Sequence, residues 1–158
     1  MLNTVERRNV LRAAGAAGAA AVAGLALTDT AQADDGSSAV IGTWVITHTD
    51  NPPSPPNTGK GVVTLGPGGI LQNVEIAPSG QVGGGAWEGL GGGAFEAVFL
   101  TGSPGGGGQP DAIVEVKPTG RVVGDRIWGT YTVSVSNAST GQVLFNGTGK
   151  FHGTRLEI

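Results

Sequence analysis

The sequence contains no cysteine. Disulfide bonds and thiolate metal sites are therefore excluded, as are a cysteine nucleophile and the acylated cysteine of a lipoprotein anchor. Basic residues are few too: nine Lys and Arg are outnumbered by twelve Asp and Glu, for a net charge of −3 at pH 7, and beyond residue 33 they form no run. Nucleic-acid binding needs clustered Lys and Arg to displace counterions, so we expect no nucleic-acid partner, and adhesion to anionic membrane surfaces is disfavoured.

Motifs for catalysis and for phosphate binding are also absent. No G-x-S-x-G sequence is present to carry a nucleophilic serine. The glycine runs at 83–85 and 105–108 do not form phosphate loops, since the second lacks a following Lys-Ser/Thr pair and no helix is predicted after it. The sequence therefore identifies no catalytic residue and predicts no cofactor.

Beyond residue 34, no segment repeats its apolar residues at the 3.6-residue period of an amphipathic helix. Several segments instead alternate apolar and polar residues and are rich in β-branched and aromatic side chains, which is typical of strands. The 30 glycines and nine prolines act largely as turn residues between these segments. The pattern predicts strands near 40–49, 60–65, 70–76, 86–90, 94–101, 111–117, 121–135 and 143–157, with turns at 66–69, 124–125 and 137–141. The last strand is expected to bend or break at 147–149.

Short connections between consecutive strands predict antiparallel neighbours in a meander. Roughly eight strands in a domain of about 125 residues favour a sheet closed on itself, because closure removes exposed strand edges. We therefore predict an all-β fold with a single antiparallel meander closed as a roughly eight-stranded barrel, and place this domain at 34–158.

The N-terminal residues carry an export motif. Arg7 and Arg8 are followed by one polar residue, two apolar residues and Arg12. This order resembles the twin-arginine (Tat) signal, although Glu6 stands where Ser or Thr is usual and Val10 where Phe is commonest. The resemblance implies export through the Tat translocase of a bacterial cell.

The residues after this motif complete the signal. Residues 13–27 form an uncharged run that is too short for a membrane-spanning helix, and Ala31 and Ala33 fit the small-x-small cleavage rule. We therefore expect a cleavable signal helix at 1–33, no stable membrane anchor, and a mature protein that is secreted.

Gly42-Thr43-Trp44 opens the first predicted strand. It resembles the G-x-W signature of lipocalins and their calycin relatives, in which the Trp plugs the closed end of the barrel. In those proteins an Arg or Lys near the end of the last strand covers the indole by a cation–π contact. The resemblance implies that Trp44 is a plug and Arg155 its lid. Allene-oxide-cyclase-type and bacterial cyclase barrels share this shape, so the exact family is left open.

If Trp44 faces the lumen, the two-residue period of a strand places His48 on the same face, further towards the open mouth. Ligands bind there in small barrels, so His48 is a candidate ligand contact; the alternative is a rim histidine in water. His152 is expected to face outward, and no third ligand has a helpful spacing, so we expect no metal site.

Three further residues are candidates for ligand binding. Gln72 interrupts an apolar even-numbered face formed by Ile70, Val74 and Ile76, unless a bulge turns it outward. The Tyr131 hydroxyl needs a hydrogen bond if it is buried. Trp87, between two glycine runs, is either an aromatic clamp at the mouth or a core anchor.

Three functions fit this pattern. The first, which we favour, is a barrel that binds a small apolar molecule in its lumen. The second is an allene-oxide-cyclase-like enzyme that promotes a cyclisation or isomerisation by holding one reactive conformer in a dry cavity. The third is a non-catalytic extracellular interaction module whose barrel is filled by side chains. A lumen of ligand size separates the first two from the third, and the sequence specifies no oligomeric state.

Overall fold

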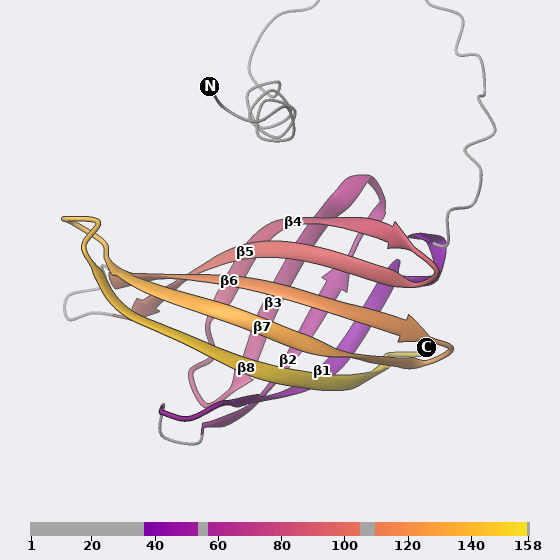
Figure 1. Cartoon of the computed structure of the whole chain (residues 1–158), viewed down its shortest axis with the longest axis horizontal. Coiled ribbons are helices and arrows are strands. Elements are labelled where there is room, and N and C mark those ends of the chain that lie inside the picture. The colour runs from indigo at the N-terminus through magenta and orange to yellow at the C-terminus, as the bar shows by residue number, and fades with distance from the viewer. Residues whose placement is uncertain (1–36, 54–56, 105–109, 158) are drawn as a thin grey trace, which may run out of the picture. The chain divides into compact units, whose positions relative to one another are not determined.

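Eight antiparallel strands form one closed barrel in which each strand pairs with its sequence neighbours and β8 closes on β1 (Figure 1). The computed structural model describes residues 37–53, 57–104 and 110–157. The strands are β1 (Gly42–Asp50), β2 (Thr58–Leu65), β3 (Ile70–Ala77), β4 (Val82–Gly91), β5 (Ala94–Pro104), β6 (Pro110–Val123), β7 (Arg126–Asn137) and β8 (Val143–Arg155), with short 3-10 segments η1 (Ser37–Ala39) and η2 (Pro67–Gly69). The predicted all-β meander and its closure are confirmed.

The predicted signal peptide at 1–33, with Arg7, Arg8, Ala31 and Ala33, lies outside the described residues. Within the described ranges, no helix is long and apolar enough to cross a membrane.

One predicted strand boundary is wrong. β6 continues through Pro118 to Val123, whereas one strand was predicted to end at 117 and the next to begin at 121. The predicted turn at 124–125 is present. Proline lacks the N–H that a strand donates to its neighbour. This loss is tolerated because the pairing of β6 with β5 is interrupted between Val116 and Thr119, while the pairing with β7 continues through Pro118 opposite Tyr131.

The expected break of the last strand at 147–149 is also absent. β8 pairs without interruption with β7 across these residues, with Gly147 opposite Val133 and Gly149 opposite Tyr131. The register shifts instead between Val135 and Ser136. Gly147 and Gly149 of β8 leave space that the rings of Phe145 and Tyr131 occupy.

A plug of buried side chains closes one end of the barrel, where η1, η2 and the β4–β5 and β6–β7 turns gather. Trp44 is fully buried there, and its indole Nε1 donates a hydrogen bond of 3.1 Å to the Val40 carbonyl. The Arg155 guanidinium carbon lies 4.1 Å from the centroid of the Trp44 ring. Arg155 also donates to the carbonyls of Ile41 and Ala39, at 2.8 and 2.7 Å. This is the plug and lid that the G-x-W resemblance implies.

Candidate functional site

A cavity of about 280 Å³ occupies the lumen above the plug. It reaches the end of the barrel where β1 ends and β2 begins, opposite the closed end. Most of its wall is aliphatic or aromatic and includes Ile46, Val63, Phe99, Val116, Val133 and Phe145. A volume near the lower edge of the usual range of about 300–1,000 Å³ for small-molecule pockets suits a small ligand.

His48 lines this cavity together with Ile46 and Asp50. This is expected, because alternate residues of a strand point to the same face. Its Nε2 lies 3.2 Å from the Glu75 Oε1 of β3, and the two side chains are only 21% and 18% exposed. The position of the ring depends on Gly59 of the adjacent strand, where an added Cβ would lie 2.6 Å from His48 Cε1. His48 is therefore a half-buried, paired side chain of the cavity wall and not a rim histidine in water.

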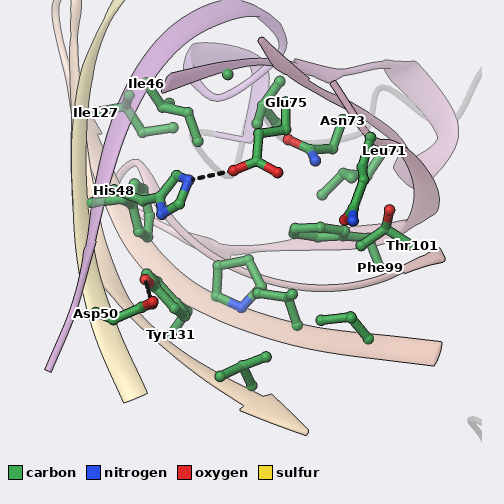
Figure 2. A pocket seen from close by; sticks show the side chains of 18 of the residues that line it. Ile46, His48, Asp50, Leu71, Asn73, Glu75, Phe99, Thr101, Ile127 and Tyr131 are labelled. Atoms are coloured by element: carbon green, nitrogen blue, oxygen red, sulfur yellow. Dashed lines mark hydrogen bonds and ion pairs between the residues drawn. The ribbon is translucent and has the colours of Figure 1, made fainter. Parts of the chain in front are cut away.

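Tyr131 and Asp50 form a second pair on the same side of the lumen. The Tyr131 hydroxyl donates to Asp50 Oδ1 at 2.6 Å, which supplies the partner that a buried phenol needs. The Tyr131 and His48 rings meet edge to face, with centroids 6.3 Å apart and planes at 78°. We call His48, Asp50, Glu75 and Tyr131 the polar cluster; Figure 2 shows His48, Asp50 and Tyr131 together, with Glu75 reaching His48 from the β3 wall.

Burial is the main reason why the pKa of Tyr131 lies well above its ordinary value of 10.0. The hydrogen bond to Asp50 and the negative charges of Asp50 and Glu75 raise that pKa further. Tyr131 is therefore a neutral hydrogen-bond donor at physiological pH. No group of three or more His, Cys, Asp or Glu side chains in the described part of the chain is arranged to hold a metal ion.

Asn73 adds a polar side chain deeper in the same wall. It lies on β3 at the inward position below Glu75 and is only 8% exposed. Among the described residues its carboxamide has no hydrogen-bond partner, and Figure 2 shows it directed into the cavity. An amide with unused donors and acceptors that faces a cavity offers a ligand a binding position.

The orientation predicted for β3 is wrong. Gln72 is exposed and does not line the cavity, because the inward residues are the odd-numbered Leu71, Asn73 and Glu75. The even-numbered apolar residues that suggested the opposite face outward, and Ile70 and Ile76 are each 61% exposed. None of the three inward residues of β3 was marked by the sequence pattern as a ligand contact.

Trp87 does not line the cavity either. It is buried in the core cluster at the closed end, and its Nε1 donates to the Gly66 carbonyl at 2.8 Å. The alternative of a core anchor therefore describes Trp87, and the interpretation as a clamp at the mouth is wrong. Of the four predicted ligand contacts, the structure brings His48 and Tyr131 to the cavity.

The raised pKa can be measured directly because Tyr131 is the single tyrosine of the chain. The absorbance of tyrosinate near 295 nm, followed from pH 8 upwards, should reach its midpoint well above the ordinary pKa of 10.0. Since the folded state holds this proton more tightly than the unfolded state, stability is present below pH 10 and is lost as the pH rises above it.

The matched variant for this titration is Asp50→Asn, which removes the charged acceptor and should move the midpoint back towards 10. Circular dichroism at each pH separates titration of the folded protein from unfolding. A midpoint at the ordinary value while the barrel is still folded would contradict the burial and pairing of Tyr131.

Comparison with known proteins agrees with the fold. No protein-family model matches the sequence, and no curated protein matches it. A solved structure of the same shape is "Structure of EF1p2_mFAP2b bound to DFHBI", with a TM-score of 0.52 and 12% sequence identity. The match covers 76% of this chain and 96% of that chain. At this identity the similarity shows the fold alone, a closed antiparallel β-barrel.

Proposed function

We propose that the protein is an exported β-barrel that binds a small apolar molecule in its lumen. The observation that carries the proposal is the cavity of about 280 Å³, which has mostly apolar walls and a few polar groups. Small-molecule sites typically combine these two features, since apolar area supplies affinity and a few polar groups fix orientation. A barrel filled by side chains, as the interaction-module alternative requires, has no such space.

Two further observations support parts of the proposal. The structural neighbour holds a ligand, DFHBI, so a barrel of this shape is compatible with ligand binding. The stacking of Arg155 on Trp44 supports a relationship to lipocalins and calycins. Export rests on the sequence alone, through the twin-arginine pair Arg7-Arg8 and the cleavage signal that ends at Ala33. On this basis the site of action is outside the bacterial cytoplasm.

The proposal predicts that filling the lumen abolishes ligand binding. Val63 of β2 faces the cavity, and its neighbour Val62 faces outward. Val63→Trp should therefore weaken binding of N-phenyl-1-naphthylamine, an apolar dye that is uncharged at pH 7, by at least tenfold, because the added indole takes up ligand space. Val62→Trp adds the same ring on the other face and should leave affinity within about twofold of the unchanged chain. Dye fluorescence, titrated with the full chain, measures both.

Equal affinity in the two variants would place the dye outside the lumen and contradict the proposal. Thermal unfolding of both variants serves as the check that each remains folded, since an oversized lumen side chain can also strain the wall.

The polar cluster supports one alternative, a barrel enzyme for cyclisation or isomerisation. His48 paired with Glu75 is placed to accept a proton, and Tyr131 is a protonated donor on the same wall. Mass spectrometry of compounds that co-purify with the protein from its own host distinguishes the two. An unaltered apolar compound supports binding, whereas a compound rearranged relative to its precursor in the cell supports catalysis.

A further inference from the structure

We propose that the cavity selects amphipathic amines, in which a small apolar body carries a protonated nitrogen that binds between Glu75 and Asp50. This inference rests on the proposed function, because it names the ligand class for the same lumen. Four features of the cavity carry it: the sign of its charge, the free capacity of its acceptors, the placement of Asn73, and the aromatic rings in its wall.

The charged groups of the cavity wall are of one sign apart from His48. Asp50 and Glu75 line the cavity, and no Lys or Arg among the described residues does. Arg155 lies at the closed end over Trp44. Lys60 and Lys150 are exposed. Each follows a buried glycine on its strand, so its side chain points out of the barrel. Two carboxylates with at most one imidazolium between them give the lumen a negative potential, which attracts a cation and repels an anion.

The two carboxylates retain acceptor capacity after their contacts within the protein. Glu75 Oε1 pairs with His48 Nε2 at 3.2 Å, Glu75 Oε2 accepts from the Ser79 hydroxyl, and Asp50 Oδ1 accepts from Tyr131 at 2.6 Å. Each carboxylate oxygen has two lone pairs, and an ammonium group has up to three N–H donors to fill them. A ligand carboxylate would bring only acceptors to a wall whose strongest groups are acceptors.

Asn73 provides a neutral acceptor beside these charges. Its carboxamide is 8% exposed, faces the cavity and has no partner among the described residues. An ammonium group that loses its water needs several acceptors at once to compensate for desolvation. Glu75 and Asn73, two residues apart on the same face of β3, offer two such acceptors on one wall.

One aromatic ring borders the proposed nitrogen position, since Tyr131 meets the His48 ring edge to face, and other rings belong to the same cavity wall. Phe99, Phe145 and Tyr131 all line the cavity, and ring faces attract cations when water is excluded. The apolar body of the ligand would lie deeper, against Ile46, Val63 and Ile127. An amine on a compact apolar body therefore matches both parts of the cavity.

The test compares three ligands with one naphthalene body: 1-naphthylmethylamine, 1-naphthylmethanol and 1-naphthylacetate. Isothermal titration calorimetry with the full chain at pH 7 should give an affinity for the amine at least about tenfold above that for the alcohol, and the acetate should bind more weakly than the alcohol. Glu75→Gln and Asp50→Asn should each lower the affinity for the amine about five- to tenfold and leave that for the alcohol within about twofold. The two variants test the inference independently, so the second variant still gives a result if the first does not fold.

Glu96→Gln is the control, because Glu96 is an exposed carboxylate on the outer face of β5. It should leave all three affinities unchanged. If N-phenyl-1-naphthylamine and the alcohol bind but the amine binds no tighter than the alcohol, the inference is overturned and the proposed function stands. If neither the dye nor the alcohol binds, the proposed function fails and the inference fails with it.

Discussion

Trp44→Ala is expected to destabilise the barrel by about 3–5 kcal/mol, the usual range for removing a buried large aromatic side chain. Trp44 has no exposed surface, so the substitution leaves a cavity at the closed end. It also removes the N–H that satisfies the Val40 carbonyl and the ring on which Arg155 stacks. For a domain of this size we expect a melting temperature about 10–20 °C lower. Guanidinium unfolding of the full chain measures the free energy.

Trp128→Ala is the matched control for the plug. Trp128 is the outward tryptophan of β7 and is 43% exposed, so its loss should cost less than about 1 kcal/mol. If the two variants lose similar stability, Trp44 is not the residue that closes the barrel.

The closed barrel and the inward face of β1 could be predicted from the sequence because both depend on local regularities. Short Gly-rich turns between alternating segments leave few arrangements other than an antiparallel meander, and a meander of this length closes to protect its edges. On β1 a single anchored residue, Trp44, fixes the direction of every other side chain. Asp50 lies on the same face as His48, so this rule could also have identified it.

The orientation of β3 could not be read from apolarity. The face with Ile70, Val74 and Ile76 is the more apolar of the two, yet it faces outward, and the inward face carries Asn73 and Glu75. The hydrophobic pattern indicates the buried face only where that face packs in a dry core. In a lumen that keeps a cavity, the inward wall can include polar groups, and Leu71 near the plug is the buried residue that marks it.

The hydrogen-bond partners within the polar cluster could not be predicted from the sequence for a different reason. Tyr131 was recognisable as a residue that needs a hydrogen bond, but its acceptor Asp50 is 81 positions away. Similarly, Glu75 is 27 positions from His48. These pairs exist only after the barrel has closed and set the register of its strands, and no local spacing encodes them.

The space that the Tyr131 ring occupies explains why β8 carries glycine at position 149. A Cβ added there would lie 2.6 Å from Tyr131 Cε1 and closer still to Cζ and Oη. The ring cannot easily move away, because it is only 9% exposed and its hydroxyl is bonded to Asp50. Gly149 pairs directly with Tyr131 across β7 and β8, so the two residues share one space in the wall.

Gly149→Ala should therefore destabilise the protein by about 2–3 kcal/mol, as overpacking of a well-filled interior does. Gly84→Ala is the matched control, since Gly84 is exposed in β4 and a Cβ there would have only the Leu71 carbonyl within reach, at 4.0 Å. That control should be neutral or slightly stabilising, because alanine restricts the unfolded chain. In a Tyr131→Ala background the ring that would collide with the added methyl group is gone, so most of the penalty should disappear, with a coupling energy of about 2 kcal/mol in a double-mutant cycle. A penalty that persists without the tyrosine would mean that backbone strain in β8, and not the Tyr131 ring, requires glycine at this position.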